Sequence, residues 1–212
     1  MKILFYGDSI TDAGRDRNAD YSSASYGHGY PKFVAGELLF EAPEEYQILN
    51  RGISGNRIVD LYARVKADVW NHAPDVLSIL IGVNDIWHEI DHKNGVDIER
   101  FEKVYRMLIE DTLARLSDLK IIVLEPFVLE GTATQGEGRY ERFLEVKEYA
   151  KVVKKLAEEY GLCFVPLQKK FDEAAKAHGA AYYLADGVHP AVAGAKLIAN
   201  EWLKAFRDLI KE

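Results

Sequence analysis

Residues 2–11 read KILFYGDSIT, and this stretch decides the fold. Its apolar, β-prone run ILFY stops at Gly7-Asp8 and leads directly into Ser9. In an open α/β sheet, ligands bind beyond the carboxyl ends of the strands. A serine just after a strand therefore stands where a nucleophile belongs, and Gly7 allows a sharp turn and close approach of a substrate. The same pattern also occurs as an ordinary strand-to-helix turn with a capping serine.

Short apolar runs alternate with amphipathic stretches along the whole chain. Helical stripes of apolar residues, spaced by three and four, lie within residues 58–69, 101–116, 146–160 and 195–209. This alternation predicts an α/β protein with a mostly parallel sheet and helices on both faces. No linker or repeat divides residues 1–212, so we expect one domain. The predicted strands are Ile3–Tyr6, Tyr46–Asn50, Val76–Ile81, Lys120–Glu125 and Cys163–Pro166.

Composition argues against several classes of partner. A net charge of −7 is unfavourable for binding nucleic acid or anionic membranes. No apolar run approaches the length that spans a membrane. Cys163 is the single cysteine, so no internal disulfide can form, and its apolar surroundings predict a small core residue. The first predicted strand begins so early that it leaves no room for a signal peptide, and we expect a cytoplasmic protein.

Three further segments lie where partners for Ser9 should lie: NRGISGN (50–56), GVND (82–85) and DGVHP (186–190). Ester hydrolysis through a serine needs a base, a group that orients the base, and donors for the developing oxyanion. His189 can be the base and Asp186 its orienting acid, three residues apart on one helical turn. Pro190 suits the first position of the helix that follows.

The oxyanion donors can be the backbone N–H groups of Ser9 and Gly55 and the side-chain amide of Asn84. Each element also has a purely structural interpretation. Asp186 could cap a helix, Asn84 could be a turn residue, and the glycines could belong to loops. Their joint occurrence, in order and at predicted strand ends, favours a catalytic site.

The blocks GDSIT, NRGISGN, IGVND and DGVHP resemble those of the SGNH (GDSL-type) hydrolases, and they span residues 7–190. The resemblance implies a flavodoxin-like, three-layer α/β/α fold and a serine esterase that needs no metal or other cofactor. It assigns the nucleophile to Ser9, the oxyanion donors to Ser9, Gly55 and Asn84, and the acid–base pair to Asp186 and His189. These are the roles that the chemistry suggests.

The longer strings GDSITDAGR, YGHGY, NRGISGNRIVDL, IGVNDIW and VHPAVAG are similar to those of intracellular acetylxylan esterases. This resemblance implies removal of acetyl groups from xylo-oligosaccharides, by a chain that assembles into homo-oligomers. One position departs from the pattern: Ala185 stands before the acid where that subgroup has an aromatic residue. The departure weakens a specific sugar-stacking assignment and leaves the hydrolytic residues unaffected.

Two long loops, Ala13–His28 and Glu130–Gly138, are expected to border the rim that carries Ser9. We expect Asp8, Tyr26, His28 and Trp87 to contact the substrate. A rim of aromatic and polar residues (Tyr26, His28, Tyr30, Trp87, Arg139 and Tyr140) suits a sugar better than the long acyl chain of a lysophospholipid or thioester. A lysophospholipase or thioesterase, or a non-catalytic carbohydrate-binding protein, remains an alternative.

His88–His92 reads HEIDH and matches the HExxH pattern of zinc peptidases. That chemistry needs both histidines on one face of a stable helix, together with a third ligand. Here the motif follows a strand closely and runs into Lys93-Asn94-Gly95, a helix stop. We therefore expect a helix barely longer than the motif, and no zinc site.

Overall fold

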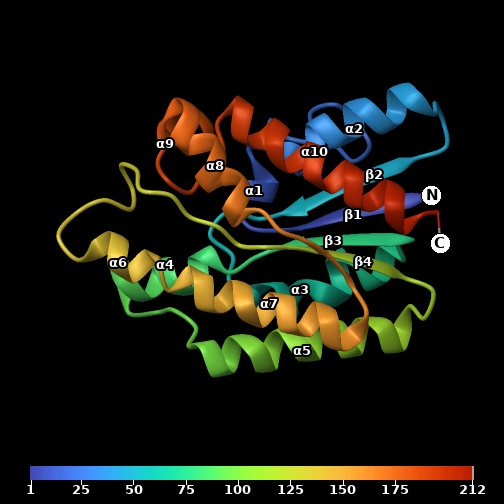
Figure 1. Ribbon diagram of the computed structural model, residues 1–212. Coiled ribbons are helices and arrows are strands. Elements are labelled where there is room, and N and C mark those ends of the chain that lie inside the picture. The colour runs from blue at the N-terminus through green and yellow to red at the C-terminus, as the bar shows by residue number, and fades with distance from the viewer. Residues whose placement is uncertain (212) are drawn as a thin grey trace.

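The computed structural model describes residues 1–211 and contains one five-stranded sheet, in which every strand is parallel to its neighbours (Figure 1). The strand order is β2-β1-β3-β4-β5. The predicted α/β fold is confirmed, and the sheet is wholly rather than mostly parallel. The strands are β1 (Lys2–Gly7), β2 (Gln47–Gly52), β3 (Val76–Leu80), β4 (Lys120–Leu124) and β5 (Cys163–Val165).

Helices cover both faces of the sheet and make the three layers that the family resemblance implies (Figure 1). One layer contains α2 (Tyr30–Glu41), α8 (Gln168–His178), α9 (Ala180–Tyr183) and α10 (Val192–Leu209). The other contains α3 (Ile58–Asp68), α5 (Ile98–Arg115) and α7 (Val146–Tyr160). The four predicted stripes lie in α3, α5, α7 and α10. The remaining short elements are α1 (Ser9–Asp12), the 3₁₀ turn η1 (Trp70–His72), α4 (Val83–His92) and α6 (Arg139–Phe143).

Strand β1 shows why its sequence is apolar throughout. Successive side chains of a strand point to opposite faces of the sheet, and here both faces are covered. On one face the Phe5 ring packs on Tyr30 and Trp202, with ring centroids 5.5 and 5.2 Å away. On the other face the Tyr6 hydroxyl donates a hydrogen bond of 2.6 Å to the carbonyl of Leu61 in α3.

The strand order creates a switch point beside β1. The chain passes from β1 to β2 on one side and then to β3 on the other, and the register sets Gly7 level with Gly52 and Leu80. In open α/β sheets, ligands bind outside the carboxyl ends of the strands at such a point. The segments that follow β1, β2 and β3 therefore meet at one edge, and these segments carry the first three sequence blocks.

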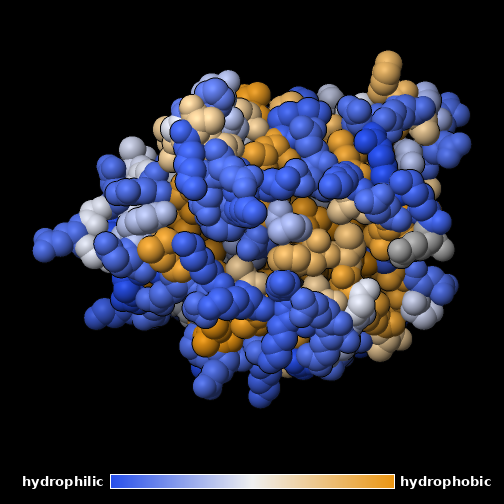
Figure 2. Space-filling model, viewed as in Figure 1, coloured by the Kyte–Doolittle hydropathy of each residue, from blue (hydrophilic) through white to orange (hydrophobic). Residues whose placement is uncertain are grey.

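Most of the surface in view is hydrophilic, with apolar atoms gathered between α10 and α7, where β5 forms the edge of the sheet (Figure 2). A hollow of about 520 Å³ lies there, lined by Leu162, Phe164, Ala205 and Leu209 among others. Cys163 is partly exposed in the same strand rather than fully buried. Among residues 1–211, no helix combines the length and the apolar character needed to cross a bilayer.

Candidate active site

Ser9 is the first residue of the short helix α1, immediately beyond β1. Asp8 caps this helix, because its carboxylate accepts a hydrogen bond of 2.9 Å from the backbone N–H of Ile10. The cap holds the turn that presents the Ser9 hydroxyl. The Ser9 Oγ atom lies 2.9 Å from Nε2 of His189, although the two residues are 180 positions apart in the sequence.

The turn around Asp186 supplies the histidine. Asp186 Oδ2 lies 2.7 Å from Nδ1 of His189, and Asp186 Oδ1 accepts the backbone N–H groups of Val188 and His189 at 2.9 and 2.8 Å. The two side chains are on one side, as expected, but they lie in a turn and not in a helix. The turn is closed by a bridge between Leu184 and Pro190.

Helix α10 begins only at Val192, with Ala191 as its N-cap residue. Pro190 therefore precedes the helix instead of occupying its first position, and that expectation is wrong. The physical reason is the bridge to Leu184, which keeps the backbone extended at Pro190. Asp186 is too far from the start of α10 to cap it, so the structural alternative for this residue does not apply.

Hydrogen bonding gives the pair opposite pKa shifts. Partial burial of Asp186 disfavours its charge, but the hydrogen bonds from His189 and Val188 outweigh that effect and lower its pKa to about 2. The bond to Asp186 raises the pKa of His189, which burial by itself would lower. The negative charge of Asp8 raises the pKa of His189 further. Asp186 is therefore ionised at neutral pH, and a proton on His189 is stabilised.

The predicted oxyanion donors share one hollow with Ser9 and His189. This hollow of about 380 Å³ is lined by Gly55 and Asn84 together with Trp87 and four other polar side chains, Ser54, His88, Asp91 and His92. Gly55 has a φ of 82°, a backbone conformation that favours glycine. One side-chain N–H of Asn84 donates to the carbonyl of Asn56 at 3.0 Å. An amide carries two such donors, so this bond orients the group while a second N–H remains for a ligand.

A second hollow adjoins the first at Ser9 and His189. It measures about 220 Å³ and is lined by Ile10, Ala13, Gly14, His28, Gly29 and Pro190. Three larger hollows, of about 520 to 690 Å³, contain none of the residues of the four sequence blocks that the chemistry requires. Size is therefore a poor guide here, and the two smaller hollows are the candidate site because they contain the nucleophile and the histidine.

The four expected substrate contacts are placed differently from one another. Trp87 and His28 line the larger and the smaller of these two hollows respectively. Asp8 and Tyr26 line neither of them and are 1% and 8% exposed. Burial raises the pKa of Asp8 to about 7, and its Oδ2 atom has no hydrogen-bond partner among residues 1–211. Asp8 and Tyr26 therefore lie behind the surface that a substrate would touch.

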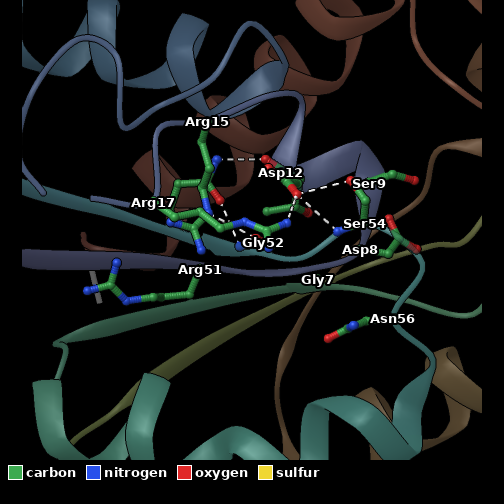
Figure 3. Close-up of polar contacts among 12 residues, drawn as sticks. Gly7, Asp8, Ser9, Asp12, Arg15, Arg17, Arg51, Gly52, Ser54 and Asn56 are labelled. Carbon is green, nitrogen blue, oxygen red and sulfur yellow. Dashed lines mark hydrogen bonds and ion pairs between the residues drawn. The ribbon is translucent and has the colours of Figure 1, made fainter. Parts of the chain in front are cut away.

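Asp12 and Ser54 are part of the site architecture and were not predicted. Asp12 Oδ2 accepts hydrogen bonds from Arg17 at 2.7 Å and from both the backbone N–H and the hydroxyl of Ser54 at 3.0 Å (Figure 3). These bonds tie the segment before Gly55 to helix α1. The position of Asp12, three residues after Ser9, was the available signal, but its partner Ser54 is 42 residues away.

The HExxH segment occupies the second half of α4, which starts at Val83 and is therefore longer than expected. It ends at the predicted stop, where Lys93 adopts a left-handed conformation. The rings of His88 and His92 lie 6.0 Å apart. Over the described part of the chain, no group of three or more His, Cys, Asp or Glu residues could hold a metal ion.

Comparisons with known proteins identify the family of this chain. The profile of the GDSL-like lipase/acylhydrolase family matches residues 5–197. The acetylxylan esterase of Geobacillus stearothermophilus is 37% identical over 209 residues, which cover 96% of this chain and 92% of that protein. Its crystal structure superposes with a TM-score of 0.84 at 36% identity, covering 96% and 93% of the two chains. A protein from Parabacteroides merdae assigned to the GDSL-like lipases superposes with a TM-score of 0.90 at 43% identity, covering 96% and 94%.

Proposed function

Because this chain belongs to the GDSL-like lipase/acylhydrolase family and is a carboxylic ester hydrolase, we propose that it removes acetyl groups from acetylated xylo-oligosaccharides or related sugars. The observation that carries the proposal is the pair of contacts from Ser9 Oγ to His189 and from His189 to Asp186, at 2.9 and 2.7 Å, beside the hollow that contains Gly55 and Asn84.

In the proposed reaction, Ser9 Oγ attacks the acetyl carbonyl carbon while Nε2 of His189 takes the hydroxyl proton. Asp186 accepts the Nδ1–H of His189, which selects the required tautomer and stabilises the imidazolium. The carbonyl oxygen becomes an oxyanion and receives hydrogen bonds from the backbone of Ser9 and Gly55 and from the amide of Asn84.

The tetrahedral intermediate then collapses as the bond from carbon to the sugar oxygen breaks, and His189 gives its proton to that oxygen. The acetyl group remains on Ser9 as an ester. A water molecule attacks this ester with His189 again as the base, and acetate leaves as the Ser9 hydroxyl is restored. Protons balance over the cycle, and every step uses groups of this chain and water.

The lining of the two hollows supports a small acyl group and a sugar. Trp87 offers an aromatic face, and His88 and His92 offer polar groups, a combination that suits a pyranose ring with its hydroxyls. The smaller hollow, about 220 Å³, is lined largely by small residues and by His28. A long acyl chain would need an extended apolar channel, and neither hollow has such a lining. The similarity to an acetylxylan esterase points to the same substrate class.

The test is deacetylation of a panel of acetylated xylo-oligosaccharides, followed by mass spectrometry, with Ser9→Ala as the control. We expect loss of acetyl groups with the parent protein and none with the variant. A strong preference for octanoyl over acetyl esters would contradict the proposed substrate and favour a lysophospholipase or thioesterase. Failure of a serine-directed phosphonate to label the protein would favour a non-catalytic carbohydrate-binding role.

The resemblance to the acetylxylan-esterase subgroup also leads us to propose that the chain forms homo-oligomers. Light scattering on the purified protein at micromolar concentration tests this. A mass equal to that of one chain, 24.0 kDa, would contradict it.

A further inference from the structure

The loop between β4 and α6 packs directly on the turn that contains Asp186. The backbone N–H of Ala133 donates to the carbonyl of Asp186 at 2.9 Å, and that of Leu129 donates to the carbonyl of Gly187 at 2.9 Å. A Cβ atom at Gly131 would lie 2.4 Å from the backbone carbonyl carbon of Asp186, so the two backbones meet with no side chain between them. This loop therefore sets the position of the Asp186 turn.

Arg139, the first residue of α6, joins this loop to helix α4. Its Nε atom donates to the carbonyl of Ala133 at 2.8 Å. Its two terminal nitrogens donate to the two carboxylate oxygens of Asp91 in α4, at 2.6 and 3.2 Å. The guanidinium thus uses its planar, forked geometry on two elements at once, which a lysine ammonium could not reproduce. The bond from Arg139 is the main cause that lowers the pKa of Asp91.

Asp91 also binds Trp87, whose ring lies beside His189. Its Oδ2 atom accepts the indole N–H of Trp87 at 2.7 Å. The Trp87 ring lies 5.8 Å from the His189 ring at an angle of 50°, and its other neighbour is Phe143 at 5.5 Å and 76°. Trp87 is therefore held by Asp91 and Phe143, and its ring packs beside the imidazole of His189.

Together these contacts form a continuous chain that connects Asp186 to His189. It runs from Asp186 through Ala133 to Arg139, and then through Asp91 and Trp87 to His189. We infer that Arg139 is a positioning residue for the proposed ester hydrolysis: it locks the loop that braces Asp186 to the helix that braces His189, and so keeps the imidazole aligned with Ser9. The inference rests on the proposed function.

The test compares Arg139→Ala and Arg139→Lys with Arg142→Ala. Arg142 lies on the same short helix and pairs with the exposed Glu145 at 2.7 Å. Arg142→Ala is therefore a matched control that also removes one surface ion pair. With an activated acetate ester, we expect Arg139→Ala to lower kcat by about tenfold to a hundredfold, because small misplacements of catalytic groups have effects of that size. KM should change by less than about threefold, since Arg139 lines neither hollow of the candidate site. Arg139→Lys should recover only a minor part, and Arg142→Ala should match the parent protein.

Asp91→Ala and the double variant Arg139→Ala/Asp91→Ala separate positioning from general weakening of the fold. If the two residues act through one connection, the double variant should lose no more kcat than the worse single variant. Additive losses, or losses that equal the decrease in the fraction of protein labelled by a serine-directed phosphonate, would overturn the inference. If Arg139→Ala does not fold, Asp91→Ala alone removes the same ion pair, and it should lower kcat to a similar extent.

A measurement without substrate distinguishes failure of this inference from failure of the proposed function. The Nδ1 proton of His189, bonded to Asp186, should give a low-field proton resonance that shifts or broadens in Arg139→Ala and not in Arg142→Ala. If the parent protein proves inert towards esters while the resonance responds in this way, the proposed function fails and the positioning role stands. If the parent protein is an esterase and Arg139→Ala leaves kcat and the resonance unchanged, the positioning role fails alone.

Discussion

Ser9 directly follows β1 and is flanked by the buried carboxylates Asp8 and Asp12, whereas Asp186 and His189 lie on a more exposed turn against which other segments pack. On the nucleophile side, Asp8 and Asp12 are 1% and 3% exposed. On the acid–base turn (residues 184–190), the side chains of Asp186 and His189 are 27% and 40% exposed. The sheet thus fixes the nucleophile, and the alignment of the base depends on loop contacts.

The difference has a consequence for substitutions. Changes behind Ser9 disturb a packed switch point, so they should reduce the stability of the fold. Changes around the acid–base turn meet a more open environment, so they should alter kcat and its pH dependence with smaller changes in stability. The following predictions test this contrast between the two halves of the site.

The largest loss of kcat should come from removing the nucleophile of one half of the site or the base of the other. Ser9→Ala and His189→Ala should each lower kcat by about a millionfold, and the double variant should be no worse than either, because nucleophile and base act as one unit. Steady-state assays with p-nitrophenyl acetate check this. Full activity of Ser9→Ala would end the serine mechanism.

Asp186→Asn should lower kcat by about ten-thousandfold, as expected when the orienting acid no longer selects the right tautomer. It should also change the pH profile. The base must be neutral, so activity is present above the pKa of His189 and is lost as the pH falls through it. The bond to Asp186 raises this pKa, so the acid limb of the parent protein should lie above about 6.5, the usual histidine value. The variant should show the limb at lower pH.

The profile of kcat/KM against pH locates the acid limb of the parent protein and that of Asp186→Asn. Asp8 is a second negative charge that raises the pKa of His189, and Asp186→Asn leaves it in place. Part of the upward shift should therefore survive in the variant. A flat profile of the parent protein down to pH 4 would contradict the role of His189 as base.

Asn84→Ala tests the sheet-held half without touching the acid–base turn. It removes one oxyanion donor and should cost about 100-fold to 1,000-fold in kcat, or about 2.7–4 kcal/mol of transition-state stabilisation. The acid limb of the pH profile should stay where it is in the parent protein, because His189 and Asp186 are unchanged. A shift of that limb by Asn84→Ala would show that the two halves are not independent.

The smallest expected effect is on stability. Asp12→Ala removes the carboxylate that accepts from Arg17 and twice from Ser54, and it should lower the free energy of unfolding by about 1.5–3 kcal/mol, the range for hydrogen bonds to a charged group. Urea denaturation gives the value. Asp16→Ala, an exposed neighbour, is the control and should change stability by less than about 0.5 kcal/mol. Equal losses in the two variants would remove the special role of Asp12.

Much of the fold could be predicted because its signals are local. Most of the strands contain a short apolar run, and α3, α5, α7 and α10 each show a regular apolar stripe. Helix α2 was not foreseen, since it carries apolar residues on more than one face: Tyr30, Val34 and Leu38 are buried, while Phe40 is 87% exposed. Periodicity cannot detect a helix whose polar and apolar residues are mixed around its circumference.

The candidate site divides in the same way. Ser9, Gly55, Asn84, Asp186 and His189 could be named from the sequence, because a turn at a strand end and a short motif are features of consecutive residues. The bonds from Asp12 to Ser54 could not, since neither position has a local pattern that identifies the other. The burial of Asp8 and Tyr26, which line neither hollow, depends on how α1 and the following loop pack.

The order of residues along the chain thus determined which elements form and which chemical groups lie at their ends. The tertiary structure alone decided which ends meet, that Pro190 lies in a bridge rather than a helix, and that Arg139 joins the loop at Ala133 to helix α4. The physical reason is the range of the interactions. Propensity and hydrophobic pattern act over a few residues, whereas the contacts that align Ser9 with His189 join positions 180 residues apart and exist only after the sheet has closed.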